Sequence, residues 1–192
     1  MRRQAVERVV CFGDSNTYGY DPRSFLGERY PEEIRWTGRL ARMTGWAVAD
    51  LGCNGREIPA HPPAELLTAL DGADALTVML GSNDLLQHPE RTAWEIAAQM
   101  GTFLTQLPAV PLLLIAPPPM QRGLWVREER LLEGSAQLGT ALAGLAKDLG
   151  VSFADAADWD IPLAFDGVHF TEEGHRRFAA GVEPALCAVR GA

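Results

Sequence analysis

The chain has 192 residues, of which 47% are hydrophobic and 22% charged, and its formal net charge is −8. This length and composition are typical of one globular unit with a substantial core, so we expect a single domain over residues 1–192. The negative charge argues against nucleic acids and anionic membranes as partners, because both bind basic surfaces.

Strand and helix patterns alternate along the chain, without repeats or low-complexity linkers. The apolar runs that predict strands are residues 9–12, 47–51, 75–80, 111–116 and 151–154. The helical patterns are residues 36–44, 64–70, 92–107, 127–149 and 172–190. Thr171 is the expected N-cap of the last helix. Because parallel strands need crossover connections, this alternation predicts an α/β fold, a three-layer α/β/α sandwich with a five-stranded parallel sheet.

The apolar runs also bear on location. The run at residues 110–116 is far too short to cross a bilayer. Residues 1–7 lead directly into the first expected strand, without the apolar core of a signal peptide. We therefore expect a cytoplasmic protein with no stable membrane anchor.

The first candidate for chemistry is Ser15. The expected strand at residues 9–12 runs into the polar turn Gly13-Asp14-Ser15. Ligands of α/β proteins bind at the carboxyl ends of the strands, so a serine here would expose its hydroxyl at the rim of a site. A helix-capping serine is the structural alternative, because serine favours this kind of junction.

Asp166 and His169 form a second candidate pair. An aspartate three residues before a histidine can reach Nδ1 of the imidazole and leave Nε2 free to accept a proton from a serine hydroxyl. The alternatives are a turn role for Asp166 and a metal site that joins His169 to His175. The sequence has no His-Glu-x-x-His or Cys-x-x-Cys motif, which argues against the metal site.

Two further turns offer donors for an oxyanion. Asn83 follows the expected strand at residues 75–80 and can donate through its side-chain amide. Gly52 ends the expected strand at residues 47–51, where a missing Cβ lets a backbone N–H approach a substrate.

These segments resemble the sequence blocks of the SGNH hydrolases, also called the GDSL esterase/lipase family. Residues 12–19, Phe-Gly-Asp-Ser-Asn-Thr-Tyr-Gly, resemble the block that carries the nucleophile, and this implies that role for Ser15. Residues 50–55, Asp-Leu-Gly-Cys-Asn-Gly, resemble the second block, which implies that Gly52 is a backbone oxyanion donor.

The other two blocks match as well. Residues 81–84, Gly-Ser-Asn-Asp, resemble the Gly-x-Asn-Asp block and imply an oxyanion role for Asn83. Asp166 and His169 match the Asp-x-x-His of the last block, as orienting carboxylate and base. The match spans nearly the whole chain. It implies a flavodoxin-like fold and a serine esterase that needs no metal or cofactor.

One departure concerns Asn16, which replaces the leucine of the family's Gly-Asp-Ser-Leu motif. Residues 16–19 and 35–38 are similar to the arylesterase and acetyl-ester branch, which implies a small-molecule substrate with a short acyl group. A carbohydrate O-deacetylase, a lysophospholipase and a thioesterase stay open, as does homo-oligomerisation.

Two functions from other classes are less consistent with the sequence. A nucleotide-binding turn after the first strand is disfavoured, because the Gly-rich phosphate motifs are missing and Asp14 would repel a phosphate. A ligand-binding module without catalytic activity is hard to reconcile with four intact catalytic positions. The loops around Trp125 and Trp159 either wall the pocket or serve packing alone.

Overall fold

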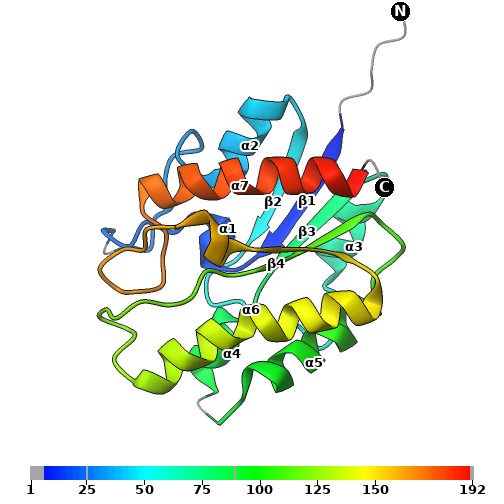
Figure 1. The fold of residues 1–192 in the computed structure, drawn as a ribbon. Coiled ribbons are helices and arrows are strands. Elements are labelled where there is room, and N and C mark those ends of the chain that lie inside the picture. The colour runs from blue at the N-terminus through cyan, green and yellow to red at the C-terminus, as the bar shows by residue number, and fades with distance from the viewer. Residues whose placement is uncertain (1–6, 25, 89, 191–192) are drawn as a thin grey trace, which may run out of the picture.

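The computed structural model describes residues 7–24, 26–88 and 90–190. Residues 1–6, most of the segment expected to lack a signal-peptide core, lie outside the described residues. The core of the fold is a five-stranded sheet in the order β2-β1-β3-β4-β5, in which every neighbouring pair is parallel (Figure 1). This is the flavodoxin-like order, and it confirms the predicted fold class.

All five predicted strands are present within one or two residues of their expected ends. They are β1 (Arg8–Gly13), β2 (Ala47–Gly52), β3 (Ala75–Met79), β4 (Leu112–Ala116) and β5 (Ser152–Asp155). Alternate residues of a strand face opposite sides of the sheet. In β1, Val10 and Phe12 therefore enter one core, and Val9 and Cys11 enter the other.

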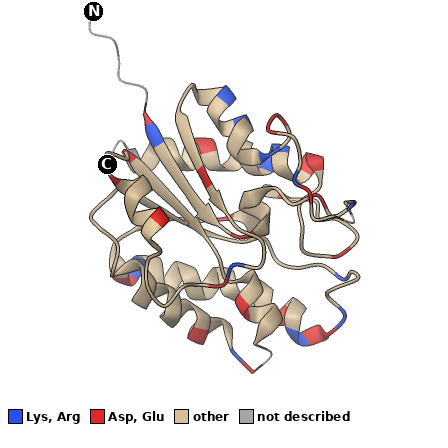
Figure 2. Ribbon diagram, turned by 180° about the vertical axis from the view of Figure 1, so that it is seen from behind, with Lys and Arg blue, Asp and Glu red and all other residues tan. Residues whose placement is uncertain are grey.

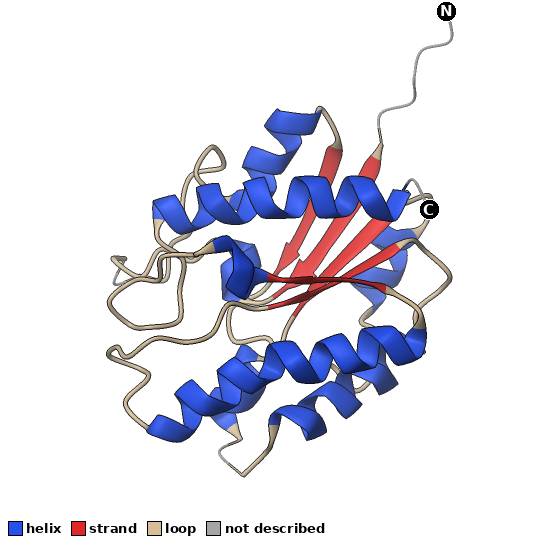
Figure 3. Ribbon diagram, in the orientation of Figure 1, coloured by secondary structure: helices blue, strands red, loops and turns tan. Residues whose placement is uncertain are grey.

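The helices cover both faces of this sheet, as Figure 3 shows. They are α1 (Ser15–Tyr18), α2 (Trp36–Thr44), α3 (Ala64–Leu70), α4 (Ser82–Gln87), α5 (Ala93–Leu104), α6 (Glu129–Leu149), α7 (Glu172–Arg190) and the 3-10 helix η1 (Ala156–Trp159). The longer helices α3, α5 and α6 pack on one face, and α2 and α7 pack on the other. The predicted helices are confirmed, including the cap of α7, where Thr171 Oγ1 accepts the Gly174 N–H at 3.0 Å.

Three short helices are absent from the sequence prediction. Helices α1, α4 and η1 have only four to six residues, too few to show a helical period. Two of them matter for the site, because α1 follows β1 directly and α4 follows β3. Strands β1 and β3 are neighbours in the sheet, at the point where the order in which strands are added reverses. Ligands of α/β folds bind at such a point.

Charged residues lie mainly outside the sheet. Figure 2 shows acidic and basic residues interspersed over the helices and loops, with few on the strands. This is the distribution expected of a sheet buried between two helical layers. Within the described part of the chain, no helix is long and apolar enough to span a bilayer.

Candidate active site

Ser15 is the first residue of α1, at the carboxyl end of β1. The N-cap of this helix is Asp14, whose Oδ1 accepts the Asn16 N–H at 2.9 Å, so the capping role that the sequence left open for Ser15 belongs to its neighbour. Burial raises the pKa of Asp14 to about 6, although the bond from Asn16 and the nearby His169 favour the charged form. The Ser15 hydroxyl is thus left free for other contacts.

The Ser15 hydroxyl meets His169, which lies 154 residues further along the chain. Ser15 Oγ is 2.9 Å from His169 Nε2, and His169 Nδ1 is 2.7 Å from Asp166 Oδ2. All three residues are at least nine-tenths buried. A hydroxyl, an imidazole and a carboxylate in this order form a path along which a proton can leave the hydroxyl.

The carboxylate of Asp166 fixes which imidazole nitrogen carries the proton. Its Oδ1 accepts the backbone N–H groups of Val168 and His169, at 2.9 and 3.0 Å. Burial raises the pKa of Asp166, but the bonds from the His169 side chain and from these two N–H groups outweigh burial and lower it. An ionised carboxylate only accepts hydrogen bonds, so Nδ1 carries the hydrogen and Nε2 is the acceptor for the Ser15 hydroxyl.

The loop that carries Asp166 is held by the segment 121–125. The N–H of Gln121 donates to Gly167 O at 3.0 Å, and the N–H of Trp125 donates to Asp166 O at 3.1 Å. The two backbones touch: a Cβ at Gly123 would lie 2.3 Å from the carbonyl carbon of Asp166. Only glycine allows the two backbones to approach this closely.

Aromatic rings flank the imidazole. The ring centroids of Tyr20 and Trp125 lie 4.5 and 4.9 Å from that of His169. Trp125 is half exposed and lines the pocket in front of Ser15, so its loop is part of the site wall. Trp159 behaves differently, because it packs against Phe178 of α7 and serves the core.

The pocket in front of the hydroxyl has a volume of about 180 Å³. Its lining residues come from the loops and helices that follow β1, β2, β3, β4 and β5: Ser15, Tyr20, Asn54, Gly55, Asn83, Trp125, Val168 and His169. Of the five residues predicted from the sequence, Ser15, Asn83 and His169 line it, and Asp166 stands behind His169.

Asn83 is the second residue of α4 and presents its amide to this pocket. Its Nδ2 donates to Arg56 O at 3.1 Å. Because a carbonyl oxygen can only accept hydrogen bonds, this contact orients the amide with its NH2 group toward the turn that follows β2. An NH2 group has two hydrogens, and the second is available to a substrate oxygen.

Gly52 is not brought to the pocket. Its N–H donates to Asp50 Oδ1 at 3.0 Å, and a Cβ at this position would lie 1.9 Å from Tyr18 N. Gly52 is therefore a packing glycine, where β2 passes close to α1.

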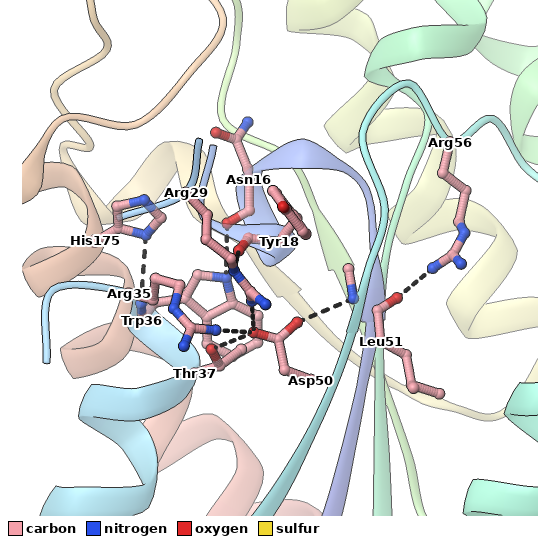
Figure 4. Close-up of polar contacts among 11 residues, drawn as sticks. Asn16, Tyr18, Arg29, Arg35, Trp36, Thr37, Asp50, Leu51, Arg56 and His175 are labelled. Atoms are coloured by element: carbon pink, nitrogen blue, oxygen red, sulfur yellow. Dashed lines mark hydrogen bonds and ion pairs between the residues drawn. The ribbon is translucent and has the colours of Figure 1, made fainter. Parts of the chain in front are cut away.

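Asp50 is the centre of a polar cluster beside this strand (Figure 4). Its Oδ2 accepts bonds from Arg29 Nη2 at 2.7 Å, Arg35 Nη1 at 2.9 Å and Thr37 Oγ1 at 2.8 Å. Arg29 also donates through Nε to Tyr18 O at 2.8 Å, at the end of α1. The cluster connects β2 and α2 to α1, the helix that carries Ser15. The other carboxylate oxygen of Asp50 accepts the Gly52 N–H, the group predicted from the sequence to bind an oxyanion.

Gly55 takes the place at the pocket that Gly52 does not fill. It lies in the turn after β2 with φ of +72°, a conformation that favours glycine. Within the described residues, its N–H has no hydrogen-bond acceptor. The pair Asn54-Gly55 is a common turn dipeptide, and that was the signal in the sequence that could have pointed to this position.

A metal site is the remaining alternative from the sequence. In the ranges that the structure describes, no group of three or more His, Cys, Asp or Glu residues is placed to hold a metal ion. His175 lies buried in α7, where its Nδ1 accepts the Trp36 N–H at 3.3 Å.

Comparisons with known proteins identify the family and agree with the fold. The model of the GDSL-like lipase/acylhydrolase family matches residues 11–177. The native aryl esterase of M. smegmatis superposes with a TM-score of 0.85 at 26% identity, covering 96% of this chain and 100% of that one. Est24, a carbohydrate acetylesterase from Sinorhizobium meliloti, superposes with a TM-score of 0.80 at 29% identity, covering 95% and 99%. A search of curated sequences found no match.

The chain therefore belongs to the GDSL-like lipase/acylhydrolase family, the SGNH hydrolases. It is a carboxylic ester hydrolase.

Proposed function

We propose that this protein is a serine esterase that hydrolyses short-chain aryl or acetyl esters through an acyl-enzyme intermediate. Ser15 is the nucleophile, His169 the general base and Asp166 the residue that orients it. The observation that carries the proposal is the pair of contacts on the two imidazole nitrogens, 2.9 Å to Ser15 Oγ and 2.7 Å to Asp166 Oδ2.

The first half of the reaction acylates the serine. Ser15 Oγ attacks the carbonyl carbon of the ester as its proton passes to His169 Nε2, and the carbonyl oxygen becomes an oxyanion. When the tetrahedral intermediate collapses, the bond to the alcohol oxygen breaks and Nε2 returns the proton to that oxygen. The alcohol leaves, and the acyl group stays on Ser15.

The oxyanion needs donors that are in place before charge develops. We assign three: the N–H of Ser15 at the start of α1, the N–H of Gly55 and the second hydrogen of Asn83 Nδ2. Gly55 replaces Gly52 in this assignment, because the Gly52 N–H is bonded to Asp50.

The second half repeats the chemistry with water. His169 Nε2 takes a proton from a water molecule as the water oxygen attacks the acyl carbon. Collapse of the second intermediate releases the carboxylic acid and returns the proton to Ser15 Oγ. The same donors stabilise both intermediates.

The pocket supports a short acyl group. Its volume of about 180 Å³ is smaller than the roughly 300–1,000 Å³ of sites that enclose a drug-sized ligand. The rings of Tyr20 and Trp125 beside the imidazole provide apolar contact for an aryl or acetyl ester. A long lipid acyl chain has no comparable enclosure there.

The test is Ser15→Ala, with Ser82→Ala as its matched control. Both serines are buried first residues of short helices that follow a strand. Loss of the nucleophile should leave only about 10³ to 10⁴ of acceleration over water, whereas Ser82→Ala should hydrolyse p-nitrophenyl acetate at the parent rate. Substantial turnover by pure Ser15→Ala would refute the mechanism, and an inactive parent would favour the module without catalytic activity.

A substrate panel tests the specificity. It contains p-nitrophenyl esters from acetate to palmitate, together with acetylated xylose and glucosamine. We expect kcat/KM to be highest for acetate and to fall with chain length; a preference for palmitate would favour the lysophospholipase or thioesterase alternative. Faster release of acetate from the sugars than from the aryl ester would favour a carbohydrate deacetylase.

Further parts of the proposal come from the sequence. We take residues 1–192 as a single domain that acts in the cytoplasm on a small-molecule ester without nucleic acid or membrane partners. The enzyme is expected to keep its activity in EDTA, because no step uses a metal.

A further inference from the structure

The side chain of Asn16 bridges the two elements that carry Ser15 and His169. Asn16 Nδ2 donates to Val168 O at 3.1 Å, and Asn16 Oδ1 accepts the Phe170 N–H at 2.9 Å. Val168 and Phe170 are the two neighbours of His169 in the chain. One amide group, next to Ser15, therefore holds the backbone on both sides of the imidazole.

Asn16 is itself firmly placed. Its backbone N–H donates to Asp14 Oδ1 at 2.9 Å, and its backbone oxygen accepts Trp36 Nε1 at 3.1 Å. Trp36 is 1% exposed, at the start of α2, and Figure 4 shows its indole directed at Asn16. The side chain of Asn16 thus links the backbone around His169 to α1, and α1 is itself held by Asp14 and Trp36.

The chemistry of the bridge selects asparagine. Its amide presents one donor and one acceptor, as a backbone peptide does in a sheet, and here they meet a carbonyl and an N–H two residues apart. Leucine has a similar size but would leave both backbone groups without a partner. Asn16, Val168 and Phe170 are 3%, 6% and 0% exposed, so water could not readily replace the lost bonds.

Aspartate would keep only half of the bridge. A carboxylate at position 16 could still accept the Phe170 N–H, but its second oxygen would face the carbonyl oxygen of Val168. The bridge therefore depends on the amide NH2 group as well as on side-chain size. This gives a physical reason for the departure from the family's Gly-Asp-Ser-Leu motif.

We propose that Asn16 is a positioning residue that sets the distance and orientation of the His169 imidazole relative to the Ser15 hydroxyl. This inference rests on the proposed function of Ser15 and His169. Proton transfer requires the two heavy atoms to stay at hydrogen-bond distance, and a displacement of about 1 Å is enough to lower a rate ~10²-fold. Asn16 does not line the pocket, so it acts on the rate of chemistry rather than on substrate binding.

The experiment compares Asn16→Leu and Asn16→Asp with the parent enzyme. We expect Asn16→Leu to lower kcat about 10²-fold with KM near the parent value, and Asn16→Asp to show a smaller loss in the same direction. The rate at which diisopropyl fluorophosphate labels Ser15 should fall together with kcat, because labelling also needs the imidazole to take the hydroxyl proton.

Ser135→Ala is the matched control. Ser135 is 4% exposed, accepts the Met120 N–H at 2.9 Å and donates to Leu132 O at 3.0 Å, so Ser135→Ala also loses two hydrogen bonds to the backbone. Within the described residues, the hydrogen bonds of the Ser135 hydroxyl reach neither Ser15 nor His169. The melting temperature of Ser135→Ala should fall as for the Asn16 variants, while its kcat and labelling rate stay at the parent values.

The outcomes separate this inference from the proposed function. Labelling of the parent at Ser15, together with an inactive Ser15→Ala, first establishes the nucleophile. A folded Asn16 variant with the parent kcat and labelling rate would then overturn the role of Asn16 alone. If Asn16→Leu does not fold, the kcat and the labelling rate of Asn16→Asp provide the test. If Ser15→Ala is active, both proposals fail.

Discussion

His169 Nδ1 and Asp166 Oδ2 lie 2.7 Å apart, and the side chains are only 3% and 2% exposed. In the proposed mechanism, His169 takes a proton at this poorly solvated position, and the charge of the carboxylate stabilises the imidazolium that forms. The same carboxylate holds two backbone N–H groups and so fixes its own loop. Asp166 therefore has both an electrostatic and a structural part in the site.

The first prediction concerns the electrostatic part. Asp166→Asn keeps the size of the side chain but removes its charge and its control of the imidazole tautomer, and kcat should fall by about 10⁴. The measurement is single-turnover hydrolysis of p-nitrophenyl acetate. Asp158→Asn removes an exposed carboxylate from η1 and should match the parent. A loss of less than tenfold in Asp166→Asn would show that His169 needs no carboxylate.

The second prediction separates an oxyanion role of Asn83 from a turn role. Asn83→Ala should lower kcat by about 10² to 10³, with little change in KM, because the donor acts on the transition state. Gln99→Ala is the matched control, since Gln99 Nε2 donates to Ile58 O at 2.7 Å in the same segment that Asn83 holds. Gln99→Ala should lose stability and keep its turnover. Asn83→Ala with a lower melting temperature and parent kcat would refute the oxyanion assignment.

The sequence predicts most of this fold, because the strands and long helices have clear periods. Val9 to Phe12 alternate between two cores, and helix α5 begins at a capping box in which Thr92 and Glu95 bond each other's backbone N–H groups. Helices α1 and α4 have no such signal. They have four and six residues, and each comes directly after a strand. Their positions therefore depend on where β1 and β3 end rather than on a pattern in their own residues.

The candidate site is predicted less evenly. Ser15 and Asn83 follow from motif residues at strand ends, Asp166 and His169 follow from their spacing in a loop, and the structure brings the four together. The exclusion of Gly52 could not follow from the sequence, although the turn dipeptide Asn54-Gly55 marks Gly55 there. It depends on the Asp50 carboxylate, which captures the Gly52 N–H, and on the approach of Tyr18.

The third prediction tests that distinction. A Cβ at Gly52 would lie 1.9 Å from Tyr18 N, so Gly52→Ala should push α1 away and destabilise the protein by about 1–3 kcal/mol. Gly55 has open space around its Cβ position, and Gly55→Ala should cost only the strain of a positive φ, about 1 kcal/mol, and keep the N–H. Urea unfolding of both variants measures the difference. Equal stability of the two would contradict the packing role of Gly52.

The last prediction concerns His175, which is completely buried in α7. Burial lowers its pKa to about 3, and the positive charges of Arg39 and Arg35 act in the same direction. The folded protein thus holds a neutral imidazole at a pH where the unfolded chain binds a proton. Stability from this group is complete above the unfolded pKa of about 6.5 and is lost as the pH falls from there toward 3.

Between pH 7 and pH 5 this loss amounts to about 2 kcal/mol, from roughly 1.5 pH units at 1.36 kcal/mol each. His175→Gln does not titrate and keeps an acceptor for the Trp36 N–H, so its free energy of unfolding should fall by about 2 kcal/mol less than that of the parent over this interval. Urea unfolding at both pH values gives the comparison, with the exposed His61→Gln expected to follow the parent. If His175→Gln loses as much stability as the parent, His175 is not the group that makes the fold acid-sensitive, and its imidazole must accept a proton without leaving the folded state.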